Sequence, residues 1–405
     1  MKKGQRDERV VWFVVPWSPL QQGGVSAVVQ RLAAGMNAIP DVAASIVVND
    51  WPSKQPQWGD DSFLRFRFQA IVADTWRATL ISIGRFPVAL WRTATLLHRS
   101  RVHAVNFHFA DHSAVCIAVL KRLGLYRGRL LISLHGTDVR LPSSFVERVA
   151  LRLSLRQATA IVACSKSLAT RVTEVFSVAR DRVEVVYNGA DSGIFHPGAL
   201  PNGLLLGAIP ARFIASVGAF IPRKAHKDLV HAFALVLRRV PDMHLCLAGA
   251  AGGELEAVKS LVDALGLAAR VHFHVGIAPG DVAALLAQAE VCVQPSLAES
   301  HPLAVLEAGA CGTPVAASAI PGHGELIVDG ETGSLFPAGD PAACAEVVLK
   351  MIADVDRTRA MAESFRWRVR TVFTWERCVS RYSELLGVGG PGALGRSEAD
   401  GPAGA

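Results

Sequence analysis

Apolar and polar residues follow two different patterns along this chain. Short apolar runs, such as those in residues 9–16 and 160–163, predict buried strands of a parallel sheet. Between such runs lie stretches in which apolar residues recur every three or four positions. Val28, Val29 and Leu32 follow this spacing and predict a helix over residues 26–36. Because strands and helices alternate in both halves, the sequence predicts two doubly wound α/β domains.

The predicted elements form two separate series. Strands are expected at residues 9–16, 45–48, 102–109, 130–134, 160–163 and 183–186, and again at 213–217, 244–248, 271–275, 291–293 and 314–317. The clearest helices are expected at residues 26–36, 255–265, 281–288, 303–310, 342–353 and 373–386, with others ending at 176 and 237. Around residues 76–83 and 90–97 the pattern predicts two helical pieces, interrupted near Gly84 and Pro87.

A change in composition marks the boundary between the halves. Residues 198–212 are rich in Gly, Pro and Leu, which is typical of a linker. The expected division is an N-terminal Rossmann-like domain at 1–197, the linker at 198–212, a C-terminal Rossmann-like domain at 213–370, a helix at 371–387 and a tail at 388–405. Because the tail is rich in Gly, Pro and Ala, it is expected to be disordered.

Composition adds the broad class and the compartment. The 405 residues are 51% hydrophobic and 19% charged, which suits two domains with well-buried cores. Seven cysteines are spread singly, which argues against a zinc ribbon or a disulfide framework and favours a reducing compartment. The apolar run near the N-terminus is too short for a signal peptide or a membrane span, so the expected location is the cytoplasm.

Positive charge is concentrated in the first half. Residues 1–200 carry 25 Lys and Arg against 14 Asp and Glu, whereas the remainder carries 17 against 21. Seven arginines lie in residues 63–101 among tryptophans and aliphatic residues. Such a basic amphipathic stretch can lie on an anionic membrane, which would place the protein at the inner face of the cell membrane. The alternative is a pair of core-facing helices with arginines in solvent. No recognition element for nucleic acid is evident, so no nucleic-acid partner is expected.

The most informative stretch is residues 294–314, which predict a strand, a loop and a helix. Pro302 suits the first position of that helix and Gly312 its end. The free N–H groups and the dipole at a helix start attract an anion. Glu299 precedes this start and Glu307 follows it by two turns, and a carboxylate suits the neighbouring hydroxyls of a sugar. The site therefore suits a nucleotide sugar; the alternative is a surface helix with two solvated glutamates.

This stretch resembles a known family. Residues 295–315, PSLAESHPLAVLEAGACGTPV, are similar to the E-x7-E region of retaining GT-B glycosyltransferases of the glycosyltransferase family 4 (group 1) type. The resemblance implies that Glu299 contacts the donor sugar and Glu307 the nucleotide ribose. The donor-binding set expected around them comprises Ser300, His301, Pro302 and Leu303 at the helix start, with Val275 and Gly276 near the base.

Further motifs place candidate residues in the first half. Gly23 and Gly24 follow the first strand, where glycines let backbone approach a phosphate, although a tight turn without a ligand fits as well. His135 and Asp138 follow the strand at 130–134, where α/β sheets bind ligands. A structural histidine is the alternative for His135. The segment HGTD resembles the family's H-G-x-D, which implies that His135 faces the reacting sugar and that Asp138 lies beside it.

One loop departs from the family pattern. Lys224 matches the lysine that stabilises the leaving diphosphate, but Ala219 stands where arginine is usual. Arg223 is long enough to substitute for that arginine. Two solvated cations on a loop are the alternative, and a scaffold that has lost catalysis is a rival function that Ala219 favours.

The resemblance implies a fold and a reaction. The fold is GT-B, with two Rossmann-like domains facing across a cleft and the last helix crossing back to the first domain. The reaction is retaining, metal-independent transfer of a sugar from a nucleotide-sugar donor to an acceptor hydroxyl, with no cofactor besides this donor. The expected acceptor is a glycan or a lipid-linked molecule, in polysaccharide or glycolipid assembly. Another GT-B enzyme, such as a nucleotide-sugar epimerase or a phosphorylase, is the remaining rival.

Overall fold

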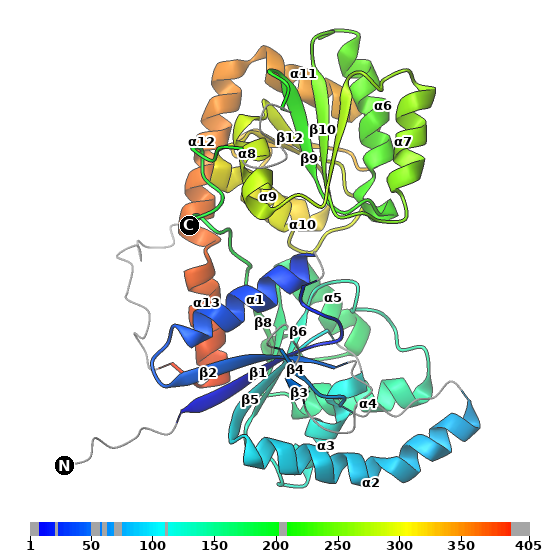
Figure 1. Ribbon diagram of the computed structural model, residues 1–405, viewed down its shortest axis with the longest axis vertical. Coiled ribbons are helices and arrows are strands. Elements are labelled where there is room, and N and C mark those ends of the chain that lie inside the picture. Colours follow the sequence, from blue (N-terminus) through cyan, green and yellow to red (C-terminus); the bar gives the residue numbers. More distant parts are fainter. Residues whose placement is uncertain are drawn as a thin grey trace, which may run out of the picture. The chain divides into compact units, whose positions relative to one another are not determined.

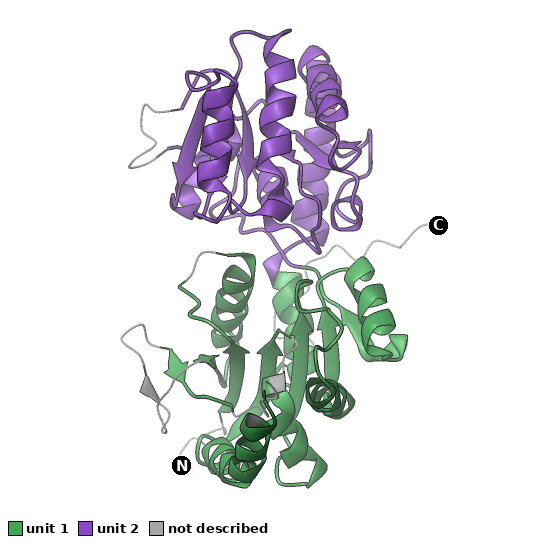
Figure 2. Cartoon of the chain, turned by 90° about the vertical axis from the view of Figure 1, so that its right-hand side faces the viewer, with its two compact units in different colours: residues 1–187, 376–405 green, residues 188–375 purple. Residues whose placement is uncertain are grey.

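The computed structural model describes residues 8–20, 23–49, 57–58, 63–68, 75–109, 112–201 and 209–389. The chain divides into two compact units (Figure 2). Unit 1 comprises Met1–Tyr187 and Glu376–Ala405, and unit 2 comprises Asn188–Trp375. Residues 188–197, which the sequence analysis assigned to the first domain, thus lie in unit 2, and most of the expected tail lies outside the described residues.

Unit 1 is built on a parallel sheet with one short antiparallel edge strand (Figure 1). The sheet has the order β3-β4-β2-β1-β5-β6-β7-β8. Its strands are β1 (Arg9–Val15), β2 (Val42–Val48), β3 (Gln57–Trp58), β4 (Leu64–Arg65), β5 (Val102–His108), β6 (Arg129–Leu134), β7 (Ala160–Ala163) and β8 (Val183–Val185). The helices are α1 (Gly24–Asn37), α2 (Trp76–Arg99), α3 (Val115–Arg122), α4 (Phe145–Gln157), α5 (Lys166–Phe176) and α13 (Trp375–Leu386), with 3-10 turns η1 (His112–Ala114) and η2 (Arg180–Arg182).

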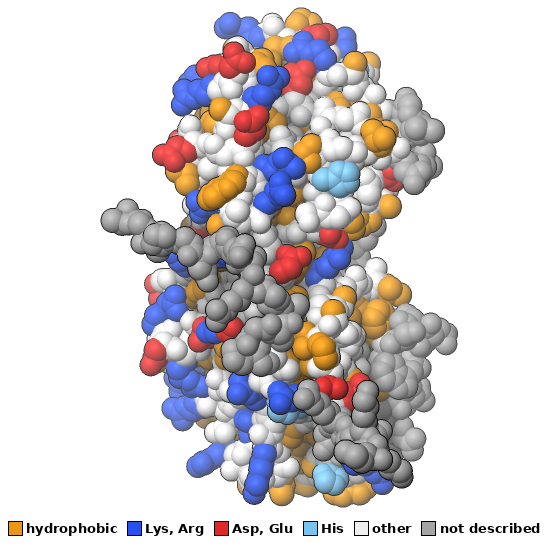
Figure 3. All heavy atoms as spheres, turned by 90° about the vertical axis from the view of Figure 1, so that its left-hand side faces the viewer, with side chains coloured by type: hydrophobic (Ala, Val, Ile, Leu, Met, Phe, Trp, Pro, Cys, Tyr) orange, Lys and Arg blue, Asp and Glu red, His pale blue; other side chains and the backbone are white. Residues whose placement is uncertain are grey.

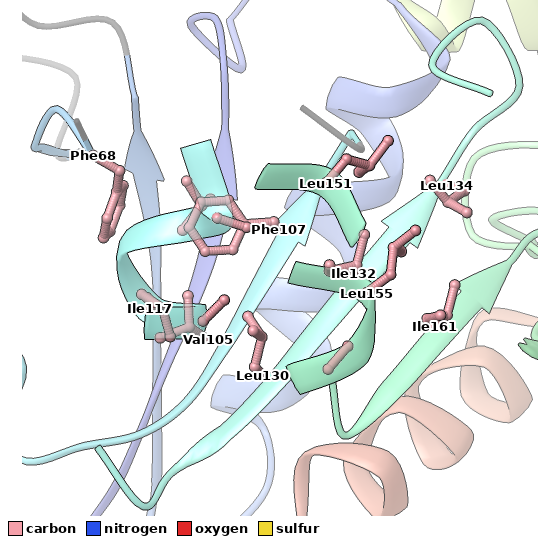
Figure 4. Close-up of a cluster of buried hydrophobic side chains, with 14 of the residues drawn as sticks. Phe68, Val105, Phe107, Ile117, Leu130, Ile132, Leu134, Leu151, Leu155 and Ile161 are labelled. Carbon is pink, nitrogen blue, oxygen red and sulfur yellow. The ribbon is translucent and has the colours of Figure 1, made fainter. Parts of the chain in front are cut away.

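The core of unit 1 forms where helices cover the sheet. Apolar side chains of β5, β6 and β7 meet those of α3 and α4, as Figure 4 shows for Phe107, Ile132, Ile117 and Leu155. Residues pointing to both faces of β1 and β5 are buried, as expected for central strands covered on both sides.

Unit 2 has a second parallel sheet, with the order β11-β10-β9-β12-β13-β14. Its strands are β9 (Phe213–Val217), β10 (His244–Gly249), β11 (Val271–Val275), β12 (Val291–Gln294), β13 (Val315–Ser318) and β14 (Ser334–Phe336). Its helices are α6 (His226–Leu237), α7 (Leu255–Ala264), α8 (Pro279–Gln288), α9 (Leu303–Cys311), α10 (Pro321–Gly324), α11 (Pro341–Ala353) and α12 (Val355–Val372), with the 3-10 turn η4 (Pro222–Lys224). The two doubly wound α/β domains predicted from the sequence are confirmed.

Each sheet has a point at which the strand order reverses. In unit 1 the chain runs from β1 outward to β2 and then returns to β5 on the other side of β1. In unit 2 it runs from β9 to β10 and later returns to β12 on the other side of β9. Loops that leave neighbouring strands in opposite directions open a crevice at the carboxyl edge, where doubly wound proteins bind ligands.

Some elements differ from the sequence prediction. The interruption expected near Gly84 and Pro87 is wrong, because α2 runs without a break from Trp76 to Arg99 with Pro87 inside it. The helices α4 and α12, the short helix α10 and the short strands β3, β4 and β14 were not predicted. Pro302, which was predicted to be the first helical residue of α9, is instead its N-cap, so the helix begins one residue later, at Leu303.

The cysteines and the surface side chains are placed as the composition of the chain suggests. All seven cysteines are buried and free, as small apolar residues would be. One face of the molecule shows Lys and Arg side chains standing among hydrophobic ones (Figure 3). Within the described ranges, no helix has both the length and the apolar character needed to span a bilayer.

Candidate functional site

A buried ion pair lies at the carboxyl edge of the unit 2 sheet. Lys224 lies in η4, just after β9, and Glu299 lies in the loop after the adjacent strand β12. Lys224 Nζ is 2.6 Å from Glu299 Oε1, and the two side chains are only 14% and 9% exposed. Burial alone raises the pKa of Glu299, but the charge and hydrogen bond of Lys224 outweigh it, and the net pKa is lowered. Glu299 is therefore ionised at neutral pH beside the amino group of Lys224.

Backbone contacts hold the two loops of this pair together. Leu297 N donates a hydrogen bond to the carbonyl oxygen of Arg223, 2.8 Å away. Gly322, in α10, packs directly on the backbone of Glu299, and a Cβ there would overlap the Glu299 carbonyl. Arg223 is exposed, and its charge also contributes to lowering the pKa of Glu299.

A second carboxylate lies near the same lysine. Glu307 is in the second turn of α9 and is partly buried. Burial raises the pKa of Glu307 to about 7, and the charge of Lys224 opposes this rise. Lys224 thus acts to lower the pKa of both glutamates of the E-x7-E pattern. At neutral pH Glu299 is ionised, whereas Glu307 is close to the midpoint of its titration.

The start of α9 lies between these two glutamates. The first N–H groups of α9, from Leu303 onward, have no partner within the helix. The side chain of His301 is buried and packs edge-on against Phe373. Burial lowers the pKa of His301 to about 4, against the charge of Glu325. The imidazole is therefore neutral, and the backbone of this loop is the part suited to a phosphate.

The remaining donor-side candidates occupy the neighbouring strand ends. Val275 ends β11 with a 40% exposed side chain, and Gly276 follows in a left-handed conformation with its N–H bonded to the carbonyl of Gly249. Ala219, in the loop after β9, is partly buried beside Gly218. These positions remain predictions for base and diphosphate contacts.

His323 is a site residue that the sequence analysis did not single out. Its ring is fully buried in α10, where Nδ1 lies 2.8 Å from the carbonyl oxygen of Ser318. That contact assigns the proton to Nδ1 and leaves Nε2 as an acceptor. Glu299 and Lys224 both influence the pKa of His323, although burial lowers it most. The only available signal was its place in the glycine turn GHG.

In unit 1, the loop after β6 carries His135 and Asp138. Backbone N–H groups of His135 and Gly136 donate to Asp138 Oδ1 at 3.0 and 2.7 Å, so the carboxylate shapes the loop. His135 Nε2 lies 2.9 Å from Nδ1 of His108, at the end of β5. Burial lowers the pKa of His135, with Asp138 opposing, so the ring is neutral and can both donate and accept.

The glycine pair of unit 1 lies at the same sheet edge. Gly23 is the N-cap of α1, and Gly24 is its first residue. Both are exposed, and a Cβ on Gly23 would meet no atom within 4 Å. On the side where a Cβ would stand, the backbone of Gly23 is therefore open with respect to the described residues.

The candidate site of unit 2 offers charged and polar groups to a ligand. Among the described residues, no group of three or more His, Cys, Asp or Glu is placed to hold a metal ion. Lys224 beside a helix start can neutralise a diphosphate, and two carboxylates can accept hydrogen bonds from sugar hydroxyls.

Comparisons with known proteins agree with this reading. The family model described as "Glycosyltransferase Family 4" matches residues 22–193, and that described as "Glycosyl transferases group 1" matches residues 210–366. The chain is 28% identical to the N-acetyl-alpha-D-glucosaminyl L-malate synthase of Bacillus anthracis, over 88% of this chain and 96% of that protein. It is 29% identical to a GDP-mannose-dependent alpha-(1-6)-phosphatidylinositol monomannoside mannosyltransferase of Mycolicibacterium smegmatis, over 74% and 80%.

Solved structures share the whole fold. The sucrose-phosphate synthase of Thermosynechococcus elongatus superimposes with a TM-score of 0.73 at 20% identity, covering 93% of this chain and 98% of that one. HepE of Anabaena, in complex with UDP and glucose, gives a TM-score of 0.72 at 20% identity, covering 94% and 99%. Two consecutive family models and the two Rossmann-like units lead to one conclusion. The chain is a GT-B protein and belongs to the group 1, family 4 glycosyltransferases.

Proposed function

We propose that this glycosyltransferase moves a sugar from a nucleotide-sugar donor to an acceptor hydroxyl with retention of configuration and without a metal ion. The observation that carries the proposal is Lys224, which is ion-paired to Glu299 and close enough to Glu307 to influence its pKa. A buried lysine beside two carboxylates and a helix start matches a ligand that is part phosphate and part polyol.

Each residue of this group has a distinct role in the proposal. Lys224 stabilises the departing diphosphate, and Arg223 supplies the second positive charge that Ala219 cannot. Glu299 positions the donor sugar and Glu307 accepts hydrogen bonds from the ribose hydroxyls. In unit 1, His135 faces the reacting sugar. HepE, solved with UDP and glucose, supports a nucleotide-sugar donor of this kind.

The surface of α2 supports a membrane-associated acceptor. Trp76, Leu80, Ile83 and Trp91 recur at helical spacing and are each more than half exposed. The sequence alternative, in which the apolar residues of this region all face the core, does not hold for these four. Exposed arginines share the helix with them: Arg77, Arg85 and Arg99.

Apolar anchors beside cations are the features with which a peripheral helix lies on an anionic bilayer. We therefore propose that α2 brings the enzyme to the inner face of the cell membrane, where it glycosylates a lipid-linked acceptor. The relative from Mycolicibacterium smegmatis is named for a phosphatidylinositol monomannoside acceptor, which is a molecule of this class.

The reaction class is tested by product analysis. The protein is incubated with UDP-, GDP- and ADP-sugars and a membrane extract, and the anomeric configuration of the transferred sugar is read by proton NMR. The proposal predicts that the transferred sugar has the same anomeric configuration as in the donor, and that the rate of transfer is the same with and without EDTA. An inverted product, or activity that EDTA abolishes and Mg²⁺ restores, would overturn it.

A further inference from the structure

A chain of buried polar side chains runs through the core of unit 1 to His135. Tyr382 OH lies 3.0 Å from Ser133 Oγ, and Ser133 Oγ donates to Asn106 Oδ1 at 3.0 Å. Asn106 Nδ2 lies 3.1 Å from His108 Nε2, and His108 Nδ1 lies 2.9 Å from His135 Nε2. These five residues come from β5, β6, the loop after β6 and α13.

The surroundings of this chain exclude water. Asn106, His108, Ser133 and Tyr382 are between 0 and 4% exposed. Burial lowers the pKa of His108 well below its usual value, and the adjacent imidazole of His135 opposes a charge there as well, so the His108 ring is neutral and has one donor and one acceptor nitrogen. The hydrogen bonds in such a chain cannot reorient one at a time without leaving a buried group unpaired.

Tyr382 determines which atom donates in each hydrogen bond of this series. Among the described residues, Ser133 is the hydrogen-bond partner found for the phenol of Tyr382. A buried hydroxyl proton without an acceptor costs free energy, so the phenol donates to Ser133 Oγ. Because Ser133 Oγ accepts from the phenol, its own single proton is donated to Asn106 Oδ1.

The same argument then assigns the donor and acceptor nitrogens of the two histidines. With its oxygen turned to Ser133, Asn106 presents its amide N–H to Nε2 of His108, which must accept. The proton of His108 therefore lies on Nδ1 and is donated to His135 Nε2. The proton of His135 in turn lies on Nδ1.

We infer that Tyr382, Ser133, Asn106 and His108 form a proton-ordering relay that fixes the Nδ1–H tautomer of His135, and that these four are positioning residues for glycosyl transfer. His135 then offers a ligand an N–H donor at Nδ1 rather than a lone pair. A donor suits a hydroxyl or ring oxygen of the reacting sugar as an acceptor. The inference rests on the proposed role of His135 in sugar transfer.

The test is the protonation of the His135 ring, read by two-bond proton–nitrogen NMR on histidine-labelled protein, with the signal assigned by its loss in His135→Gln. The relay predicts a protonated Nδ1 and a bare Nε2 in the native protein. Tyr382→Phe removes the phenol proton four hydrogen bonds away, and should convert this single tautomer into a mixture. Ser133→Ala should do the same.

Tyr126→Phe is the matched control. Tyr126 is also buried in unit 1, but its hydroxyl lies outside the relay and has no hydrogen-bond partner among the described residues. This variant should leave the His135 spectrum unchanged. A native His135 protonated at Nε2, or a Tyr382→Phe spectrum identical to the native one, would overturn the inference.

Activity supplies a second readout. Tyr382→Phe should lower kcat by about two- to tenfold, with little change in the KM for the donor, because the donor-binding residues of unit 2 are untouched. A larger KM with an unchanged kcat would contradict a positioning role. Because the NMR spectrum does not depend on turnover, an ordered tautomer in a protein that transfers no sugar would overturn the proposed function and leave the relay standing.

Discussion

At the scale of single residues, the candidate site depends on one lysine with two unlike carboxylates. The ion pair with Lys224 keeps Glu299 ionised, whereas burial holds the pKa of Glu307 at about 7. The two glutamates have the same chemistry, and their surroundings alone make them different. Such separated pKa values are typical of functional sites.

Lys224→Ala should remove most of the transfer activity. Losing the charge that meets the diphosphate should lower kcat by about 100-fold or more, the cost typical of removing a preorganised electrostatic group. It also leaves Glu299 buried without its partner, which should cost about 3 kcal/mol of stability. Steady-state kinetics and urea unfolding measure the two effects.

Lys227→Ala is the control for this substitution. Lys227 lies three residues on, is 41% exposed, and pairs with Glu254 and not with either glutamate of the candidate site. Activity and stability should stay close to native. Equal losses in both variants would contradict a special role for Lys224.

The titration of Glu307 should give stability a characteristic pH dependence. Its pKa rises from 4.5 in the unfolded chain to about 7 in the fold, so the folded state holds the proton more tightly. The resulting stabilisation is fully present below pH 4.5 and is lost as the pH rises through 7. Unfolding free energies measured between pH 4 and 8 for the native protein and Glu307→Gln should differ in slope in this window.

The same titration should affect donor binding. Ribose hydroxyls donate to a carboxylate, so affinity for the nucleotide should increase as the pH rises through about 7. Calorimetric titration with the nucleoside diphosphate measures this dependence. It should be absent in Glu307→Gln, and an unchanged pH profile in that variant would exclude Glu307 as its source.

At the scale of elements, the loops after β9 and β12 are locked by close backbone packing. Leu297 bonds to the backbone of Arg223, and Gly322 of α10 lies against the backbone of Glu299. A carbonyl group cannot rotate away as a flexible side chain can, so the position of Glu299 depends on the absence of a Cβ at residue 322.

Gly322→Ala should therefore displace Glu299. Overpacking of this kind costs about 1–3 kcal/mol, and the displaced carboxylate should reduce transfer strongly. Gly324→Ala is the matched control, because a Cβ there would meet nothing within 4 Å. Thermal unfolding and activity of the two variants should diverge; native-like behaviour of Gly322→Ala would show that the loop adjusts.

The outer face of α2 should determine membrane binding. Each tryptophan removed from a bilayer contact costs roughly 1.5–3 kcal/mol of apolar transfer, so replacing Trp76 and Trp91 by Ser should weaken binding at least about tenfold. Co-sedimentation with vesicles of anionic phospholipid measures it, with zwitterionic vesicles for comparison.

Trp367→Ser is the control for the α2 variant. Trp367 is on α12 of unit 2 and is 68% exposed, the same fraction as Trp91. This variant should sediment like the native protein. Equal loss in both variants, or no binding by the native chain to anionic vesicles, would contradict the proposed role of α2.

Strands were easier to predict than charged helices. The strands at 160–163, 213–217 and 271–275 have the predicted limits, because a continuous apolar run is distinctive. Helix α12 was missed although Thr358, Met361, Phe365 and Val369 line its buried side, because arginines and acids interrupt that stripe. In α2, Pro87 predicted a break that the helix does not make.

At the scale of the whole molecule, family membership and fold could be predicted from one stretch of sequence. The resemblance of residues 295–315 to the E-x7-E region of family 4 glycosyltransferases implied the GT-B fold, whereas the spacing of Glu299 and Glu307 alone left a surface helix as an alternative. Two features could not be predicted. The contact of His323 with Ser318 spans only five residues, but it depends on the conformation of the turn between β13 and α10, which carries no distinctive pattern. The relay joins Tyr382 to Ser133, 249 positions away, and so depends on the packing of α13 against the sheet.

The measurement that tests the central claim most directly is nucleoside diphosphate release. Native protein and Glu307→Ala are each supplied with a panel of UDP-, GDP- and ADP-sugars, with membrane extract as acceptor. The proposed donor site predicts release from one class of donor by the native protein and its loss in the variant. No release from any donor, or release that Glu307→Ala leaves unchanged, would contradict the donor site and turn attention to Ala219.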